Sequence, residues 1–201
     1  MVYVRSLIVV AGPSCAGKSH FIEDIKANRF PGIAKQLEIA TPSMWQHKEL
    51  GRFRPPPESS INRLILHCAF WLFGPAYQEV DGLEVLRHSD QITFVTLWVH
   101  PDSLLQRLKI RRTRALLGFG KATDFRTRMQ RLKQLRLREQ VYRNPSALFS
   151  HYRDWFNFCA RYNARAHWVV DVTRSKPVLF PLTEWKNQHG NPVFQPEATT
   201  D

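Results

Sequence analysis

The stretch "LIVVAGPSCAGKSH", from Leu7 to His20, joins an apolar run to a glycine-containing loop and the start of a second apolar pattern. The run belongs to "YVRSLIVVAG" (Tyr3–Gly12), whose β-branched apolar residues predict a strand buried on both faces. After the loop, "KSHFIEDIKANRF" carries apolar side chains at helical spacing and ends before Pro31. The sequence therefore predicts a strand, a loop and a helix in direct succession.

The loop itself, from Gly12 to Ser19, fits the pattern G-x-x-x-x-G-K-[ST]. Gly12 and Gly17 allow the backbone to turn and to approach an anion without a Cβ in the way. The amides from Ser14 onward are expected to point into a nest at the helix N-terminus, where the helix dipole favours negative charge. Lys18 adds a charge suited to the β- and γ-phosphates of a nucleotide, and the Ser19 hydroxyl can bind Mg²⁺. The candidate nucleotide-binding residues are Gly12, Pro13, Ser14, Cys15, Ala16, Gly17, Lys18, Ser19 and His20.

The rest of the chain alternates predicted strands with predicted helices. Further strands are expected in 34–43, 62–73, 91–101 and 165–173, and further helices in 75–89, from 102, from 125 and in 145–162. This alternation predicts an α/β fold of three layers, with a parallel sheet of about five strands. Most of the helical residues, 101–163, precede the last strand. Residues 1–175 are predicted to form one domain, and the proline-containing segment 176–201 an irregular tail.

Aromatic residues are concentrated in the predicted helix that starts at Pro145. Most of them are expected in the core, and the alternative is that one stacks on a nucleotide base. They are Tyr152, Trp155, Phe156, Phe158 and Tyr162.

Positive charge is concentrated in one part of the chain. The sequence has 29 Lys and Arg against 17 Asp and Glu, a net charge of +12. The stretch from Pro101 to Pro145 holds 13 of the basic residues and 3 of the acids, so it carries +10 of that charge. A segment of this composition is suited to an anionic partner.

The composition sets the class of protein. With 201 residues, of which 43% are hydrophobic and 23% charged, the chain can bury a core of its own. The cysteines Cys15, Cys68 and Cys159 are widely spaced and contain no CxxC pair, which favours reduced thiols and gives no sign of a zinc site. The apolar run Leu7–Ala11 is too short to span a membrane. We therefore expect a cytoplasmic protein without a membrane span.

The loop motif resembles that of the P-loop NTPase superfamily. The guanine-binding motif of GTPases and the signature of ABC ATPases are missing, and no strand ends in the acidic pair of helicases. The chain is similar to the small P-loop kinases, a group with nucleoside-monophosphate, shikimate and gluconate kinases. In that group a strand of the type "TFVTLWVHPDSLLQRLKIRRTR" leads through a helix to an arginine-bearing lid. The resemblance implies ATP and Mg²⁺ as ligands and a lid in 101–163.

Four arginines follow this junction: Arg107, Arg111, Arg112 and Arg114. The resemblance implies that a lid brings guanidinium groups over the transferred phosphoryl group. Helical spacing places Arg107, Arg111 and Arg114 near one face of the predicted helix. These three are candidate catalytic residues beside Lys18, and the alternative is a solvated basic face.

The sequence departs from the family's pattern at the carboxylate. Small P-loop kinases place an acid at the end of the strand beside the loop strand, and in "NRLILHCAF" that place holds His67. His67 is a candidate base because it titrates near neutrality, and the alternative is a packed histidine. Glu38, Asp81 and Asp171 are other candidate carboxylates, whereas Asp24 on the first helix is expected to be solvated.

These observations favour an ATP-dependent kinase acting on an anionic small-molecule acceptor, such as a sugar, a nucleotide or a polysaccharide precursor. The alternative is a nucleic-acid-directed P-loop protein, either a polynucleotide kinase or a nucleotide-switched nucleic-acid binder, because the basic segment suits a phosphate backbone. A regulatory protein that binds nucleotide without transfer is a third possibility.

Overall fold

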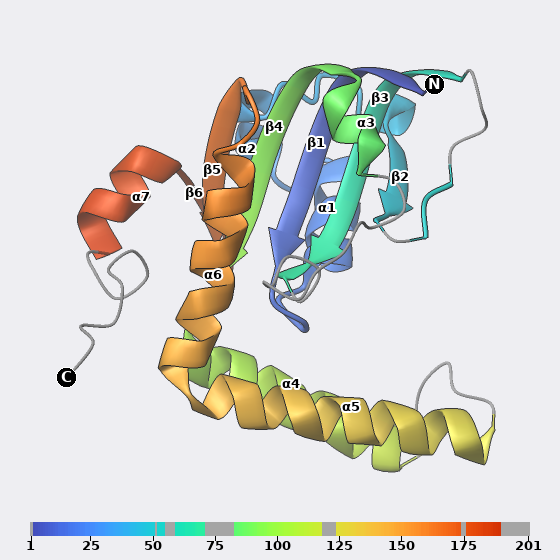
Figure 1. Cartoon of the computed structure of the whole chain (residues 1–201), viewed down its shortest axis with the longest axis vertical. Coiled ribbons are helices and arrows are strands. Elements are labelled where there is room, and N and C mark those ends of the chain that lie inside the picture. Colours follow the sequence, from blue (N-terminus) through green and yellow to red (C-terminus); the bar gives the residue numbers. More distant parts are fainter. Residues whose placement is uncertain are drawn as a thin grey trace.

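The computed structural model describes residues 2–50, 52–54, 59–70, 83–117, 124–173 and 176–189. It is an α/β fold whose six-stranded sheet has the order β2-β3-β1-β4-β5-β6 (Figure 1). The strands are β1 Tyr3–Gly12, β2 Gln46–Glu49, β3 Ser60–Ala69, β4 Ser89–Trp98, β5 Ala166–Asp171 and β6 Val178–Pro181. Strands β1 to β5 are parallel to their neighbours, and β6 is antiparallel to β5.

Strand β1 lies in the middle of the sheet because its apolar run can be covered on both faces. Val4, Leu7 and Val9 are each at most 1% exposed. The register pairs Val10 with His67 of β3 and Gly12 with Ala69. The loop after β1 and the end of β3 therefore meet at the carboxyl edge of the sheet.

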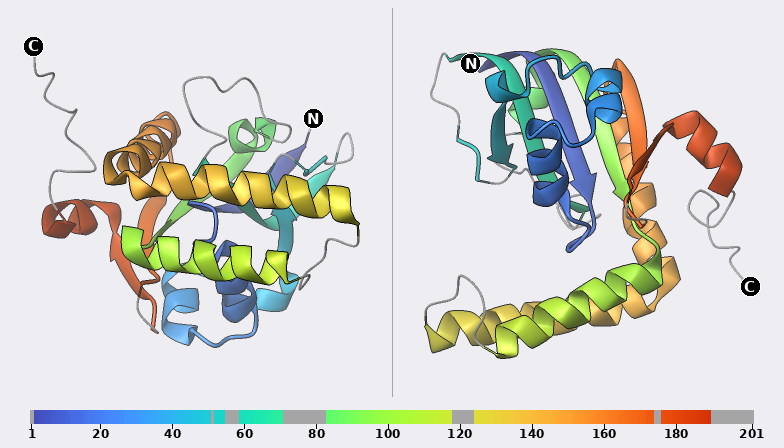
Figure 2. Two further views of the ribbon diagram at one scale, coloured as in Figure 1. Left: turned by 90° about the horizontal axis from the view of Figure 1, so that it is seen from below. Right: turned by 180° about the vertical axis from the view of Figure 1, so that it is seen from behind.

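Helices cover both faces of the sheet. Helices α1 and α2 lie on one face, and α3 and α6 on the other (Figures 1 and 2). Two long antiparallel helices, α4 and α5, lie side by side beyond the carboxyl edge of the sheet, where β1 points (Figure 2). We call this pair the helical hairpin. The helices are α1 Lys18–Lys26, α2 Pro31–Gln36, η1 Pro42–Met44, α3 Glu84–Arg87, α4 Pro101–Leu116, α5 Phe125–Arg143, α6 Pro145–Cys159 and α7 Leu182–His189.

Most predicted elements are confirmed within the described residues, but the strand expected in 34–43 is wrong. That segment contains the end of α2 and the 3-10 helix η1, and the strand β2 follows at Gln46. Pro31 occupies the first turn of α2, where a proline is well tolerated. Ile33, Ala34 and Leu37 then form a buried helical face.

The C-terminal segment also differs from the prediction. Residues 178–189 are regular, with β6 pairing along β5 and α7 following directly. Pro181 ends β6 at the edge of the sheet, where the missing amide is tolerated. Trp185 of α7 is 0% exposed and contacts Trp98, so this segment closes one end of the core.

The boundaries of the other expected helices shift slightly. The sequence predicts Asp102 or Ser103 as the N-cap of α4, but the helix begins at Pro101 with His100 as its N-cap. Helix α3 occupies 84–87 of the region 75–89, and 75–82 lie outside the described residues. The helix predicted in 145–162 ends at Cys159.

Candidate functional site

A cavity of about 1810 Å³ lies between the loop after β1 and the helical hairpin. The loop side contributes the residues from Ser14 to Phe21. The hairpin contributes side chains from both of its helices, and strands β2 and β3 contribute their carboxyl ends. The charged residues of the lining are Lys18, Asp24, Glu49, Arg52, Arg107, Arg111, Arg114, Arg131 and Arg138.

The loop presents backbone amides at this cavity. Gly17 is the N-cap of α1 with φ 91°, and no side chain caps the helix. The amides of Cys15, Gly17, Lys18 and Ser19 have no acceptor among the described residues. Cys15 also has a positive φ of 70°, which is uncommon for a residue with a Cβ. An uncapped helix start with free amides is an anion-binding arrangement.

Gly12 is favoured by close packing rather than by its backbone conformation. A Cβ at this position would lie 3.2 Å from the Cβ of Leu97 and 3.3 Å from its carbonyl oxygen. The close contact holds the end of β1 against β4. Gly12 and Pro13 thus lie buried beneath the loop, whereas Ser14 to His20 line the cavity.

The Lys18 side chain folds back to the first residues of the loop. Its Nζ donates to the carbonyl oxygens of Gly12 and Pro13 at 3.0 and 2.9 Å. Burial lowers the pKa of Lys18 to about 8, and the nearby Arg138 acts in the same direction. The ammonium is therefore held over the loop by neutral groups, which is a position from which it can move to a phosphate.

Three of the four predicted arginines of α4 face the cavity. Arg107 donates to the carbonyl oxygens of Ala16 and Val172 at 3.1 and 2.5 Å, so it joins the loop to the end of β5. Arg111 donates to the Cys15 Sγ at 3.4 Å. Arg114 lines the cavity without a hydrogen bond or ion pair to the described residues. The predicted common face is confirmed.

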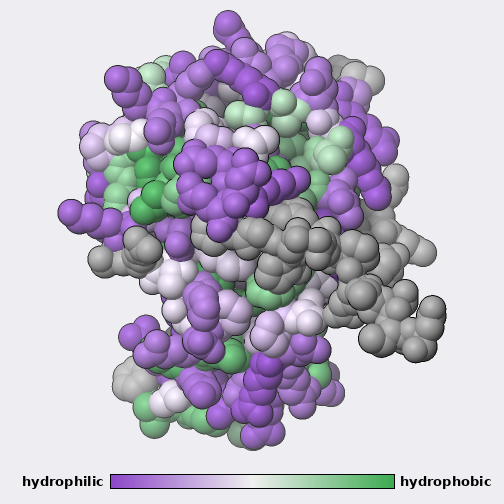
Figure 3. All heavy atoms as spheres, turned by 90° about the vertical axis from the view of Figure 1, so that its left-hand side faces the viewer, coloured by the Kyte–Doolittle hydropathy of each residue, from purple (hydrophilic) through white to green (hydrophobic). Residues whose placement is uncertain are grey.

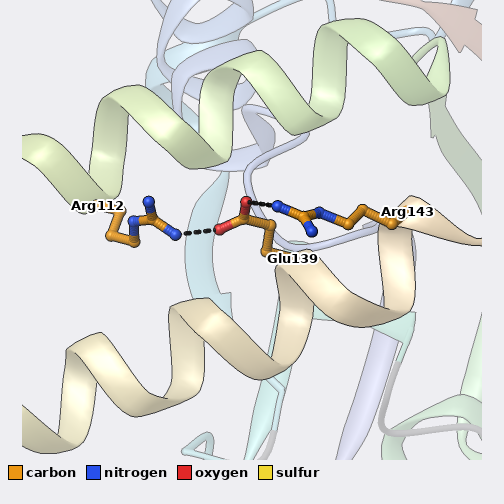
Figure 4. Close-up of polar contacts among 3 residues, drawn as sticks. All are labelled: Arg112, Glu139 and Arg143. Atoms are coloured by element: carbon orange, nitrogen blue, oxygen red, sulfur yellow. Dashed lines mark hydrogen bonds and ion pairs between the residues drawn. The ribbon is translucent and has the colours of Figure 1, made fainter.

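Arg112 points elsewhere (Figure 4). It pairs with Glu139 of α5 at 2.5 Å, and Arg143 pairs with the other carboxylate oxygen at 2.9 Å. The Glu139 side chain is only 6% exposed, so two cations compensate a buried carboxylate. This contact joins α4 to α5.

Helix α5 adds residues that sequence reasoning did not single out. Arg131, Gln134 and Arg138 line the cavity at spacings of three and four, so they share one helical face. Arg131 and Arg138 have no ion-pair partner among the described residues. One turn beyond Arg138, the Tyr142 hydroxyl accepts a hydrogen bond from the Ser14 amide at 2.9 Å. Burial raises the pKa of Tyr142 to about 12, so its hydroxyl keeps its proton.

The neighbouring strands β2 and β3 bring two histidines together, of which His67 lines the cavity. The Nε2 of His47 lies 2.7 Å from the Nδ1 of His67, and one nitrogen donates to the other. Burial and the neighbouring His47 lower the pKa of His67 to about 4. His67 lies in the cavity lining, as expected, but it is neutral at physiological pH and a weak proton acceptor.

Glu49 supplies a carboxylate at this edge. It is the last residue of β2 and the register partner of His67, and it lines the same cavity as Lys18. Its side chain is 44% exposed and pairs with Arg52 at 3.1 Å. Sequence reasoning missed Glu49 because the second strand was predicted to end before it.

The other candidate carboxylates are placed differently. Glu38 pairs with Arg165 near the start of β5, at the edge of the sheet opposite the cavity. Asp171 accepts a hydrogen bond from the Thr173 amide and is not part of the lining. Asp81 lies outside the described residues. Asp24 was expected to be solvated but is 7% exposed, pairs with Arg29, and lines the cavity.

The aromatic residues of α6 belong to the core. Trp155 packs on Phe94 and donates from Nε1 to the Thr96 hydroxyl at 2.8 Å, and the Tyr152 hydroxyl donates to the Leu97 carbonyl. None of the five candidates for base stacking belongs to the cavity lining.

The charges of the lining are strongly unequal. Seven cationic side chains face two carboxylates in this cavity. Such a surface concentrates anions. For a metal, the described residues contain no group of three or more His, Cys, Asp or Glu side chains placed to hold one ion. Ser19 lines the cavity with its hydroxyl unpaired by the described residues, which suits a cation that keeps waters and substrate phosphates as its main ligands.

None of the described helices combines the length and apolar character that crossing a membrane requires. Compared with known proteins, the chain matches no protein-family model and no curated protein.

Proposed function

We propose that this protein is an ATP-dependent phosphotransferase of the small P-loop kinase type, acting on a small-molecule acceptor such as a sugar, a nucleotide or a polysaccharide precursor. One observation carries the proposal. One cavity holds loop amides and arginines of the opposite helices that have no partner among the described residues, together with the Lys18 ammonium. These are the groups that phosphoryl transfer requires, because its catalysis rests on positioning and charge stabilisation.

The loop side is suited to the triphosphate of ATP. The amides of Cys15, Gly17, Lys18 and Ser19 offer neutral donors, and Lys18 can leave two carbonyl oxygens for the β- and γ-phosphates. Ser19 is the residue that would hold Mg²⁺ together with phosphate oxygens. Bound there, Mg²⁺ neutralises phosphate charge.

The opposite side is suited to the transferred group. Arg114 and Arg111 can reach the charge that develops on the phosphoryl oxygens, whereas Arg107 holds the loop and the end of β5 together. We assign the proton acceptor to Glu49, because its side chain is 44% exposed in the cavity lining, whereas the Nδ1 of His67 is already engaged with His47 at 2.7 Å. Glu49 takes the proton of the acceptor hydroxyl as that oxygen bonds to the γ-phosphorus and the bond to the leaving ADP oxygen breaks.

The size of the cavity supports two substrates. Pockets for one small ligand measure roughly 300–1,000 Å³, and this cavity is about 1810 Å³. Space therefore remains for an acceptor between the loop and the ends of β2 and β3, on the side of Glu49.

Calorimetric titration with MgATP tests the proposal, using the wild type, Lys18→Ala and the control Lys48→Ala on the exposed surface of β2. We expect Lys18→Ala to bind at least about tenfold more weakly, since it loses a charge-assisted contact, and Lys48→Ala to bind like the wild type. Transfer of labelled γ-phosphate to sugars and nucleotides then identifies the acceptor. Failure of the wild type to bind MgATP would overturn the proposal.

The nucleic-acid-directed alternative stays a hypothesis. The salt dependence of binding distinguishes it from a kinase that acts on a small molecule. Binding to a phosphate backbone weakens steeply with ionic strength because counterions are released. Transfer to a small acceptor should change little over the same range.

A further inference from the structure

The face of the helical hairpin that points away from the cavity has an unusual composition. Of the ten large apolar residues that are exposed in the described chain, seven lie on this hairpin; Ile110 and Leu117 line the cavity and the other five do not. Leu116 is 56% exposed, Phe125 74% and Met129 48%. None of these three belongs to the cavity lining. They stand where the end of α4 runs beside the start of α5, at the free end of the hairpin (Figure 2).

Basic side chains flank these apolar ones. Lys109 of α4 and Lys133 and Arg136 of α5 are exposed and outside the cavity lining. On α5, Phe125, Met129 and Arg136 follow at spacings of four and seven, which places them on one face of the helix. The cavity-facing residues Arg131 and Arg138 fall on a different face.

Negative charge is scarce on the described part of the hairpin. Its acids are Asp102 at the far end of α4, Asp124 at the N-cap of α5, and the buried Glu139. Lys109, Lys133 and Arg136 make no ion pair with the described residues. On this face, apolar side chains accordingly lie among cations that have no ion-pair partner in the described part of the chain. Figure 3 views the hairpin, at the bottom, from its other end, where α5 joins α6, and hydrophilic atoms predominate there with some apolar atoms between them.

We propose that this distal face, defined by Lys109, Leu116, Phe125, Met129, Lys133 and Arg136, docks on the surface of an anionic lipid bilayer. Charge complementarity selects an anionic surface, since basic residues near a membrane are attracted to anionic headgroups. The exposed Leu, Phe and Met side chains favour a surface that has an apolar layer beneath its charges. A lipid bilayer has such a layer, in which interfacial helices bury their apolar side chains. A nucleic acid satisfies the first condition but offers little for the aliphatic side chains.

The docking surface leaves the cavity open. The apolar and basic residues of the distal face lie on the side of the hairpin opposite the arginines of the cavity. The hairpin can therefore rest on a bilayer while its other face lines the cavity. This inference does not depend on the proposed function, because no residue of the distal face belongs to the proposed catalytic machinery.

Sedimentation of the full chain with vesicles tests the inference, with phosphatidylcholine alone and with phosphatidylcholine containing phosphatidylserine. We expect binding to the anionic vesicles and little to the neutral ones. Phe125→Ser should lower the partition coefficient about tenfold, because one aromatic side chain loses its burial. Lys133→Gln should lower it roughly fivefold through the loss of one charge.

The matched controls lie on the sheet part of the molecule. Met44→Ser removes an apolar side chain that is 63% exposed, and Lys48→Gln removes an exposed charge of β2. Both controls should bind the vesicles like the wild type, and calorimetry with MgATP should give equal results for wild type and Phe125→Ser. Three results would overturn the inference: no vesicle binding by the wild type, equal losses in the controls, or a single-stranded oligonucleotide that binds through Phe125 and Lys133 and displaces the vesicles.

Discussion

The loop after β1 and the helical hairpin face the same cavity with different chemistry. The loop offers backbone amides of a helix start whose place is fixed by the packing of Gly12 against Leu97. The hairpin offers long arginine side chains, of which Arg114, Arg131 and Arg138 have no partner among the described residues. Fixed neutral donors are suited to hold an anion, and adjustable cations to meet charge that develops during a reaction. Changes in the loop should therefore alter nucleotide affinity, and changes in the hairpin should alter rate.

The largest expected effect is on the hairpin side. Arg114→Ala should lower the rate of phosphoryl transfer about 10²- to 10³-fold and the affinity for MgATP less than about threefold, because the charge acts in the transition state. Arg126→Ala is the control, since this exposed arginine of α5 lies outside the cavity lining. Steady-state kinetics and calorimetry measure the two quantities. If Arg114→Ala lowered only the affinity for MgATP and left the transfer rate unchanged, the proposed difference in role between the loop and the hairpin would be wrong.

The carboxyl edge of the sheet provides the second test. Glu49→Gln should lower the transfer rate about 10²-fold if Glu49 takes the proton of the acceptor. His67→Gln should change it far less, because the Nδ1 of His67 is already hydrogen-bonded to His47. Single-turnover rates of the two variants decide between them. A larger loss for His67→Gln would assign the proton transfer to the histidine pair.

Lys18 makes the affinity of the loop depend on pH. Burial lowers the pKa of Lys18 to about 8, so the ammonium loses its proton as pH rises through that value. The affinity for MgATP should then fall roughly tenfold per pH unit above the pKa. Lys18→Arg should show a flatter profile because a guanidinium keeps its charge. Calorimetry between about pH 7 and pH 9.5 gives both profiles, and parallel profiles would contradict the assignment.

The smallest expected effect concerns the contact between the two regions. Tyr142→Phe removes the acceptor of the Ser14 amide and should lower the free energy of unfolding by about 1 kcal/mol. Tyr162→Phe is the control, because that hydroxyl makes no hydrogen bond with the described residues. Urea unfolding followed by fluorescence compares the two variants. Equal losses would mean that the hydroxyl of Tyr142 does not join the hairpin to the loop.

Much of this arrangement could be predicted from the sequence, because the deciding signals are local. The run Tyr3–Gly12, the loop motif and the helical spacing of Arg107, Arg111 and Arg114 each lie within a short segment. Pairing of β1 with β3 was expected, and it brings His67 to the edge of the cavity. The mostly parallel α/β sheet follows from the alternation of strands and helices.

The site residues that the sequence did not predict reach the cavity through contacts between segments that are far apart in the chain. Strand β2 is a four-residue edge strand whose side chains are mostly exposed, so no hydrophobic pattern marks it, and Glu49 was not recognised. Tyr142 meets Ser14 across 128 residues of sequence. Arg131 and Arg138 could have been found by the helical spacing that grouped the arginines of α4. The direction in which that face points depends on how α4 and α5 pack together, including the buried pairing of Glu139 with Arg112, which the sequence does not reveal.

Amide hydrogen exchange with and without a non-hydrolysable MgATP analogue tests most directly whether the two regions share one ligand. We predict slower exchange in the loop from Ser14 to Ser19 and, in the same titration, in α4 and α5 around Arg114 and Arg138. In Lys18→Ala, the same analogue concentration should slow amide exchange neither in the loop nor in the hairpin. Protection of the hairpin alone, or no protection in either region, would contradict the account.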